Sequence, residues 1–107
     1  MTVLITETYF TKSGKESEFK SLLQKWRKYM KDNREKLKEM KSWKIYIQTF
    51  GNNAGAHVEQ VEFDSLAEFE KFNDRLKKDK EFMKLDQETM AIIDNTTLSI
   101  NVWSTEK

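Results

Sequence analysis

Hydrophobic and polar residues alternate along residues 2–11 with the period of two that is typical of a β-strand. One alternating set contains Val3, Ile5, Glu7 and Tyr9, and the other contains Leu4, Thr6, Thr8 and Phe10. After a turn, apolar residues recur at intervals of three and four, which predicts a long amphipathic helix near residues 15–40. Ser13 and Glu16 have the spacing of a capping box and predict where this helix begins.

The middle of the chain has the pattern of a β-hairpin followed by a helix. Residues 42–50 and 57–63 both alternate, and the GNNAG segment between them tolerates positive φ. Ser65 and Glu68 repeat the capping-box spacing, so a second helix is expected to begin there. Its expected buried stripe contains Leu66, Phe69, Phe72 and Leu76. The KKDKE segment at 77–81 interrupts the apolar pattern and predicts a break or bend, and a last strand is expected over residues 96–103.

The resulting order of elements is βαββαβ, which predicts one ferredoxin-like α+β domain over residues 1–107. In this fold, a four-stranded antiparallel sheet carries two helices on one face. A half-covered sheet should alternate more cleanly than these strands do, because bulky residues occupy both sets, such as Ile45 beside Tyr46 and Val102 beside Trp103. The sheet face opposite the helices therefore needs to be covered, and a second copy of the chain is expected to cover it.

Composition narrows the classes of protein. The 107 residues contain no cysteine, the first ten residues lack a signal-peptide pattern, and no apolar run approaches the length of a membrane span, so a cytoplasmic location with no membrane contact is expected. Residues 15–44 carry eleven Lys or Arg against five Asp or Glu, which we interpret as a solvated helix face. An RNA-recognition domain shares the βαββαβ order, but the third strand here is acidic and lacks the required basic-Gly-aromatic signature, so no nucleic acid is expected as a partner.

Two segments resemble NIPSNAP-type proteins. TETYFTKSGKESEFKSLLQKW at residues 6–26 is similar to their opening, in which a strand with a Thr-Tyr pair leads through a Gly-Lys turn into an amphipathic helix. HVEQVEFDSLAEFEKF at residues 57–72, followed by KKDKEF at 77–82, is similar to their second half. These proteins belong to the dimeric α+β-barrel superfamily, together with antibiotic-biosynthesis-type monooxygenases and haem-degrading enzymes. The resemblance implies a homodimer with its sheets face to face and, in each subunit, a pocket between helices and sheet.

The chain departs from this family at polar positions. Family members often carry an arginine where Glu7 stands and a histidine where Glu59 stands. Tyr9 and the Asp64–Ala67 segment are retained, and the retained residues explain folding rather than chemistry. No family active site is therefore carried onto this chain.

Four polar side chains are candidates for chemistry. Glu7 and Tyr9 share one face of the first strand, and His57 and Glu59 share one face of the third. These strands are neighbours in a ferredoxin-like sheet, so the four side chains are expected to converge, and two carboxylates with an imidazole and a phenol suit proton abstraction. The alternative is that both glutamates flank an exposed end of the barrel and are neutralised by Lys12 or Lys44, with His57 an exposed residue of the hairpin.

Metal and cofactor sites are not expected. One histidine, no cysteine and unclustered carboxylates do not provide a zinc or iron site. Haem iron commonly takes a histidine ligand, which the haem-degrading relatives carry on their second helix, and residues 66–93 contain no histidine.

Two classes of function follow from these patterns. The first is a protein or enzyme that binds a small hydrophobic or aromatic molecule, in its sharpest form a cofactor-independent monooxygenase. In that form Glu59 or His57, assisted by Glu7, ionises an activated aromatic whose carbanion reduces O₂, while Tyr9, Trp26 and Phe69 contact the ring. The second is a non-catalytic homodimeric interaction protein, in which the aromatic residues simply fill the core.

Overall fold

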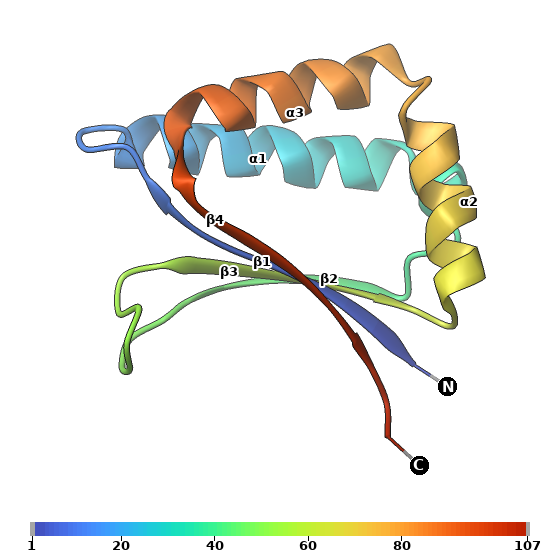
Figure 1. The fold of residues 1–107 in the computed structure, drawn as a ribbon. Helices are drawn as coiled ribbons and strands as arrows, with labels where there is room; N and C mark the ends of the chain where they lie inside the picture. The colour runs from blue at the N-terminus through green and yellow to red at the C-terminus, as the bar shows by residue number, and fades with distance from the viewer. Residues whose placement is uncertain (1, 107) are drawn as a thin grey trace.

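The computed structural model describes residues 2–106, and in this range four strands form one antiparallel sheet with helices on one of its faces (Figure 1). The strand order is β2-β3-β1-β4, as in a ferredoxin-like fold, so the predicted fold class is confirmed. The elements are β1 (Val3–Thr11), α1 (Glu16–Asp32), the 3-10 turn η1 (Arg34–Leu37), β2 (Ser42–Ile47), β3 (His57–Phe63), α2 (Leu66–Leu76), α3 (Lys80–Ile92) and β4 (Ile93–Ser104). None of the helices in the described range is long and apolar enough to cross a membrane.

The first helix is shorter than predicted. It ends at Asp32 rather than near residue 40, and the chain continues as η1. The Asn33 side-chain amide donates to the Tyr29 carbonyl at 2.8 Å, the kind of local hydrogen bond by which Asp and Asn compete with helix propagation. The helix begins at Glu16, close to the predicted residue 15, but the capping box predicted at Ser13 is wrong. Ser13 lies in a turn with Gly14 at φ +79°, and Lys15 occupies the cap position without a side-chain hydrogen bond.

The second helical region is divided, as the KKDKE segment predicted. The Ser65 hydroxyl accepts a hydrogen bond from the Glu68 amide at 3.2 Å and caps α2, so this capping prediction is confirmed. The Asp79 carboxylate accepts from the Phe82 amide at 3.0 Å and begins α3 as a separate helix, which lies beside α1 (Figure 1). Leu66, expected to be buried, is 49 % exposed because it occupies the first position of α2 at the rim of the helical layer.

The core lies between the sheet and the helices. Phe63 of β3 contacts the rings of Phe69 and Phe72 of α2, with ring centroids 5.3 and 5.0 Å apart. Other buried apolar residues come from every layer: Val3, Ile5, Tyr9, Phe19, Leu22, Tyr29, Leu37, Ala56, Leu76, Leu85, Ile92 and Ile93. Odd-numbered side chains of β1, namely Val3, Ile5 and Tyr9, belong to this core and identify the covered face of the sheet.

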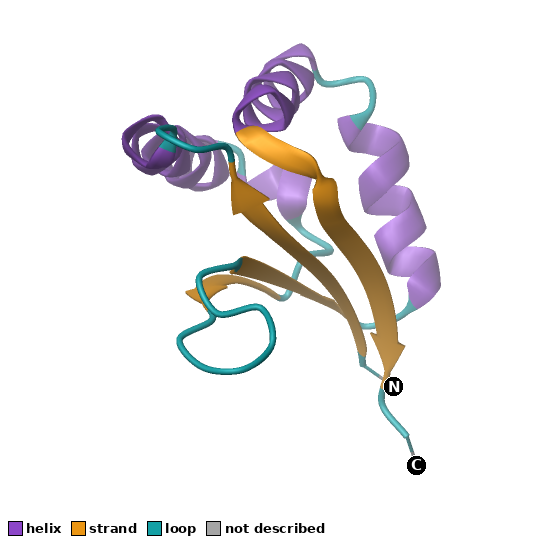
Figure 2. Cartoon of the chain, turned by 60° about the vertical axis from the view of Figure 1, so that its left-hand side comes forward, coloured by secondary structure: helices purple, strands orange, loops and turns teal. Residues whose placement is uncertain are grey.

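The opposite face of the sheet has no covering element in the described range. The helices lie on one side, and the β2–β3 loop extends away on the other (Figure 2). Trp103 of β4 and Tyr46 of β2 lie on this uncovered face and are 55 % and 48 % exposed. The Trp103 indole N–H donates to the Thr6 hydroxyl at 2.8 Å, which holds the indole against the sheet. Large aromatic residues are thus presented from both edges of one sheet face.

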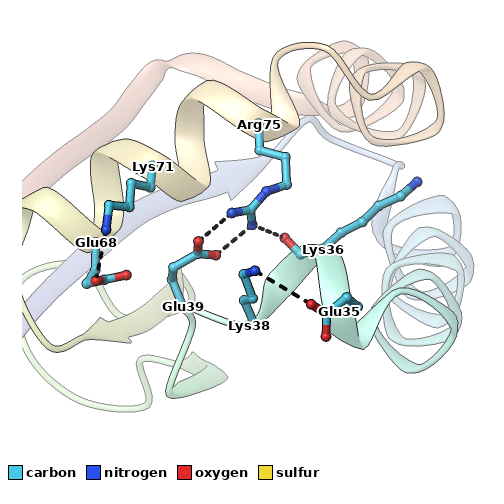
Figure 3. Close-up of polar contacts among 7 residues, drawn as sticks. All are labelled: Glu35, Lys36, Lys38, Glu39, Glu68, Lys71 and Arg75. Carbon is cyan, nitrogen blue, oxygen red and sulfur yellow. Dashed lines mark hydrogen bonds and ion pairs between the residues drawn. The ribbon is translucent and has the colours of Figure 1, made fainter.

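An ion pair joins η1 to α2 at the end of the helical layer. The Arg75 guanidinium binds both oxygens of the Glu39 carboxylate, with Nη1 at 2.6 Å from Oε1, and also donates to the Lys36 carbonyl at 2.7 Å (Figure 3). The hydrogen bonds from Arg75 lower the pKa of the Glu39 carboxyl to about 2, although the burial of this carboxyl acts in the opposite direction.

We expect Arg75→Leu to lower the free energy of unfolding by about 2 kcal/mol near neutral pH, since it leaves a buried carboxylate without its donor. Glu39 has a pKa of about 2 in the folded protein against a usual 4.5, so its contribution is complete above 4.5 and is lost as pH falls toward 2. Urea unfolding should therefore show the difference from wild type shrinking over that range. Lys71→Leu, which removes the exposed partner of Glu68, is the matched control and should change the unfolding free energy by less than about 0.5 kcal/mol.

Candidate functional site

Glu7 and Glu59 lie directly opposite each other on neighbouring strands. The antiparallel register pairs Glu7 of β1 with Glu59 of β3, and it pairs Tyr9 with His57 two residues further along β1. Directly paired residues point to the same face, and Val3, Ile5 and Tyr9 mark this face as the one beneath the helices. The register therefore places the four residues on the covered face of two neighbouring strands, where both glutamates are partly buried.

Trp43 holds one of the two carboxylates. Its indole N–H, on the adjacent strand β2, donates to Glu59 Oε1 at 2.7 Å. Glu7 has no side-chain hydrogen bond or ion pair with any other residue in the described range 2–106. The alternative in which Lys12 or Lys44 neutralises the pair is wrong for this structure, because neither lysine forms an ion pair with either glutamate and Lys44 lies on the uncovered face.

A third carboxylate approaches from the helical layer. Asp86 occupies a position in the buried stripe of α3, between Leu85 and Thr89, and is only half-exposed. The negative charge of Asp86 is the smallest of the causes that raise the pKa of Glu7 and Glu59. Burial also raises the pKa of Asp86 itself.

The two glutamates differ in their affinity for a proton. Burial raises the pKa of Glu59, but the Trp43 hydrogen bond stabilises its charged form and opposes the increase. Burial, the charge of Glu59 and then the charge of Asp86 raise the pKa of Glu7 to about 7. Glu59 is therefore the first of the pair to ionise, and Glu7 exchanges its proton near neutral pH.

His57 and Tyr9 form the aromatic end of the site. The His57 ring lies 4.2 Å from the Phe19 ring and 5.8 Å from the Tyr9 ring, measured between centroids, so it is half-buried rather than an exposed hairpin residue. Burial lowers the pKa of His57, while Glu16 opposes this change. Tyr9 is 2 % exposed, and burial together with the charges of Glu59 and Glu7 raises the pKa of its hydroxyl, which therefore remains protonated.

Trp26 and Phe69, both expected to contact a ligand, pack within the protein. The Trp26 indole N–H donates to the Thr89 hydroxyl at 2.9 Å, and its ring contacts Phe82 at a centroid distance of 5.3 Å in the α1–α3 interface. Phe69 packs against Phe63. These contacts are those of core residues, so the site described here uses neither side chain.

Two open hollows flank the Arg75 side chain. Their walls combine basic and acidic side chains, and several of these are already paired, such as Lys36 with Asp79 at 2.7 Å. Within residues 2–106, no group of three or more His, Cys, Asp or Glu side chains is arranged to hold a metal ion. Neither hollow is lined by Glu7 or Glu59.

Two residues of this site were not predicted from sequence. Asp86 could have been predicted from the sequence, because its carboxylate occupies a position in the apolar stripe of the helix, between Phe82 and Thr89. Trp43 alternates with Ile45 and Ile47 and so resembled a core residue. Only the register between β2 and β3 reveals that its N–H reaches Glu59.

Comparisons with known proteins identify the fold. Neither protein-family models nor curated protein sequences provide a match to this chain. A NIPSNAP family protein from Agrobacterium tumefaciens superimposes with a TM-score of 0.75 at 11 % identity, covering 99 % of this chain and 94 % of that one. An uncharacterised NIPSNAP domain protein from Burkholderia xenovorans gives a TM-score of 0.72 at 13 % identity, covering 97 % and 94 %. A hydroxynitrile lyase from Passiflora edulis gives 0.71 at 13 % identity, covering 99 % and 94 %.

The class defined by these likenesses is a NIPSNAP-like, ferredoxin-like α+β fold. At these identities, the likeness is one of fold. The resemblance inferred from the sequence is thus confirmed at the level of architecture.

We expect Glu7→Gln to stabilise the protein at alkaline pH. The folded protein holds the Glu7 proton more tightly than the unfolded chain, with a pKa of about 7 against 4.5, so Glu7 ceases to favour folding as pH rises through this range. The gain of the variant over wild type should appear between these values and reach about 2–3 kcal/mol near pH 8 in urea unfolding. Glu62→Gln, on the other face of β3, is the control. A gain that does not vary with pH would contradict the assignment.

Proposed function

We propose that this chain is a small-molecule-binding protein whose ligand site is the Glu7–Glu59–Asp86 cluster, and that it acts there as a cofactor-independent enzyme of proton transfer. The observation that carries the proposal is the pairing of the partly buried Glu7 with Glu59 on the covered face, without a cationic partner for Glu7 among the described residues. Burial and the charge of Glu59 raise the pKa of Glu7 to about 7. A general base is most effective when its pKa lies near the working pH. The hydroxynitrile lyase among the similar structures supports the view that this fold accommodates an active site.

The roles of the residues follow from their protonation states. Glu7 accepts a proton from a weakly acidic C–H or O–H bond of the bound molecule and returns it later. Tyr9 keeps its own proton and donates a hydrogen bond to the oxygen on which negative charge develops. Glu59, fixed by Trp43, keeps the pKa of Glu7 high, so it acts as a positioning and tuning residue rather than as the base.

The finer form of this proposal is a monooxygenase acting on an activated aromatic molecule. Removal of a proton by Glu7 would leave a carbanion stabilised by the ring, and this carbanion would transfer electrons directly to O₂ to form a carbon-bound peroxide. The peroxide would take up the proton from Glu7, and cleavage of its O–O bond with loss of water would leave a carbonyl group on the substrate. His57, neutral at pH 7 because burial lowers its pKa, is then suited to pack against the ring rather than to serve as the base.

A homodimer is the second part of the proposal. Trp103 and Tyr46 lie on one uncovered sheet face, on strands at opposite edges, and a monomer would leave both in water. A second copy placed face to face would bury them, and roughly 800 Å² per subunit is the usual area of a stable interface. Because Glu7 points to the other face, this interface leaves the ligand site in each subunit accessible.

Proton transfer can be tested with anthrone, an aromatic ketone with an acidic methylene group. We expect the protein to accelerate deuterium exchange into that methylene, followed by NMR, with a rate that rises as pH increases through about 7. Glu7→Gln should reduce the protein-catalysed rate by about a hundredfold or more, whereas Glu62→Gln should keep it. Parallel measurement of O₂ consumption tests the monooxygenase form. Wild-type exchange rates in Glu7→Gln would show that another group is the base.

The dimer can be tested by sedimentation at micromolar concentration. We expect wild type to sediment at twice its chain mass of 12.8 kDa and Trp103→Asp to sediment as a monomer, because the new carboxylate would be buried without a partner. Leu66→Asp introduces the same charge at an exposed apolar residue on the helical side and should remain a dimer. A wild-type protein that sediments as a single chain would contradict the proposed interface.

A further inference from the structure

The uncovered face of the sheet carries very little charge. The strand registers place three rows of four residues on this face, and the rows run across the sheet through Leu4, Thr6 and Thr8 of β1. Charged residues make up 35 % of the chain, yet these rows contain one lysine, Lys44, and one glutamate, Glu62. The net charge of the face is therefore zero, and a shortage of charged residues is typical of the centre of a protein interface.

The two large aromatic residues of this face lie at diagonally opposite corners. Tyr46 is on β2 and Trp103 is on β4, the two edge strands of the sheet. Trp103 is in the row of Leu4 and Tyr46 is in the row of Thr8, four residues away along β1. With strands about 4.8 Å apart and residues about 3.4 Å apart, the separations across and along the strands are both about 14 Å, so the line joining the two aromatic residues runs at about 45° to the strands.

A twofold axis that lies between two copies, along the other diagonal of this face, exchanges the aromatic corners. Each Tyr46 then faces Trp103 of the partner subunit, and the strands of the two sheets cross at about 90°, which is one of the two usual arrangements of packed sheets. The same rotation carries Lys44 from the row of Thr6 to a position between Leu4 and Glu62 of the partner subunit. One operation therefore places aromatic on aromatic and lysine beside glutamate, twice each.

The other twofold arrangements about the middle of this face give poorer contacts. An axis along the strands places Trp103 over Ser42 of the partner subunit, and an axis across the strands places each Lys44 over its own copy. An axis through both aromatic corners carries Lys44 to the row of Thr8, the row farthest from Glu62. Like charges that face each other across an interface are costly, and a charge without a partner gains nothing there.

We propose that two copies of this chain pack through their uncovered faces with the strands crossed at a right angle, so that Tyr46 contacts Trp103 of the partner subunit and Lys44 pairs with Glu62 of the partner subunit. This inference rests on the proposed homodimer and assigns the arrangement of its subunits. Ser99 occupies a corner on the twofold axis and therefore faces its own copy. Tyr46, in contrast, lies about 20 Å along the face from its own copy.

Charge reversal tests the contact between Lys44 and Glu62. Lys44→Glu and Glu62→Lys each bring like charges together at two places in a homodimer, so each variant should dimerise at least about tenfold more weakly than wild type in sedimentation. An equimolar mixture should recover dimers that contain one chain of each variant, measured by native mass spectrometry, because both contacts then join opposite charges. Lys71→Glu and Asp74→Lys, at exposed positions of α2, reproduce the two net charges and should dimerise as wild type does, with no preference for mixed dimers.

Crosslinking tests the position of the twofold axis without a change of charge. The chain contains no cysteine, so Ser99→Cys introduces a single thiol of similar size. A bis-maleimide that spans about 10 Å, the spacing of packed sheets, should join two Ser99→Cys chains readily. Tyr46→Cys chains should be joined far less, although a mixture of Tyr46→Cys with Trp103→Cys should be joined to each other.

The results separate this arrangement from the homodimer itself. Charge-reversed variants that form homodimers as tightly as wild type, or Tyr46→Cys chains that are joined more readily than Ser99→Cys chains, would overturn the arrangement while the wild-type dimer stands. A wild-type protein that sediments as a single chain would overturn both the homodimer and its arrangement.

Discussion

The pairing of β1 with β3 is the constraint on which both the fold and the site depend. It places Val3 beside Phe63 and Glu7 beside Glu59 on the covered face, so one register determines the apolar core and the acidic cluster together. A slip by one residue would turn every side chain of the strand to the other face. Val3 and Phe63 are each 1 % exposed, and their burial therefore holds the two glutamates in an environment that neither would enter alone.

The folded protein tolerates the acidic cluster because protonation of Glu7 can reduce the negative charge of the cluster. Three ionised carboxylates in one partly buried volume would repel strongly, but Glu7 remains half protonated near neutral pH and reduces that repulsion. The Trp43 hydrogen bond decides which member of the pair is charged, since it favours the ionised form of Glu59. Without the hydrogen bond from Trp43, which reaches only Glu59, the two glutamates would have more similar affinities for a proton. Neither residue would then be singled out as the base.

The sequence was informative wherever one side chain and its immediate neighbours decide the outcome. Ser65 caps α2 as predicted because the capping bond spans three residues, and the alternation of β1 and β3 identified which polar residues share a face. The sequence was less informative at Ser13, which lies in the turn around Gly14 and does not cap α1, and at Asn33, where a competing hydrogen bond ends the helix. The role of Trp43 depends on how β2 aligns with β3, and that of Asp86 depends on how α3 lies over the sheet. Both are tertiary facts that no local pattern contains.

The two proposed roles of the protein use opposite faces of the sheet: proton transfer uses the covered face, and dimerisation uses the uncovered face. Odd-numbered residues of β1 form the core and the acidic site, while even-numbered residues of the same strand belong to the face that presents Trp103 and Tyr46. Adjacent residues on one strand therefore serve different surfaces, and a substitution on one face leaves the side chains of the other in place. Coupling between the faces would have to pass through the backbone of β1, where Thr6 accepts the Trp103 hydrogen bond one residue before Glu7. An interface that moved this segment would move the proposed base with it, so assembly and proton transfer share one strand even though they use opposite sides of it.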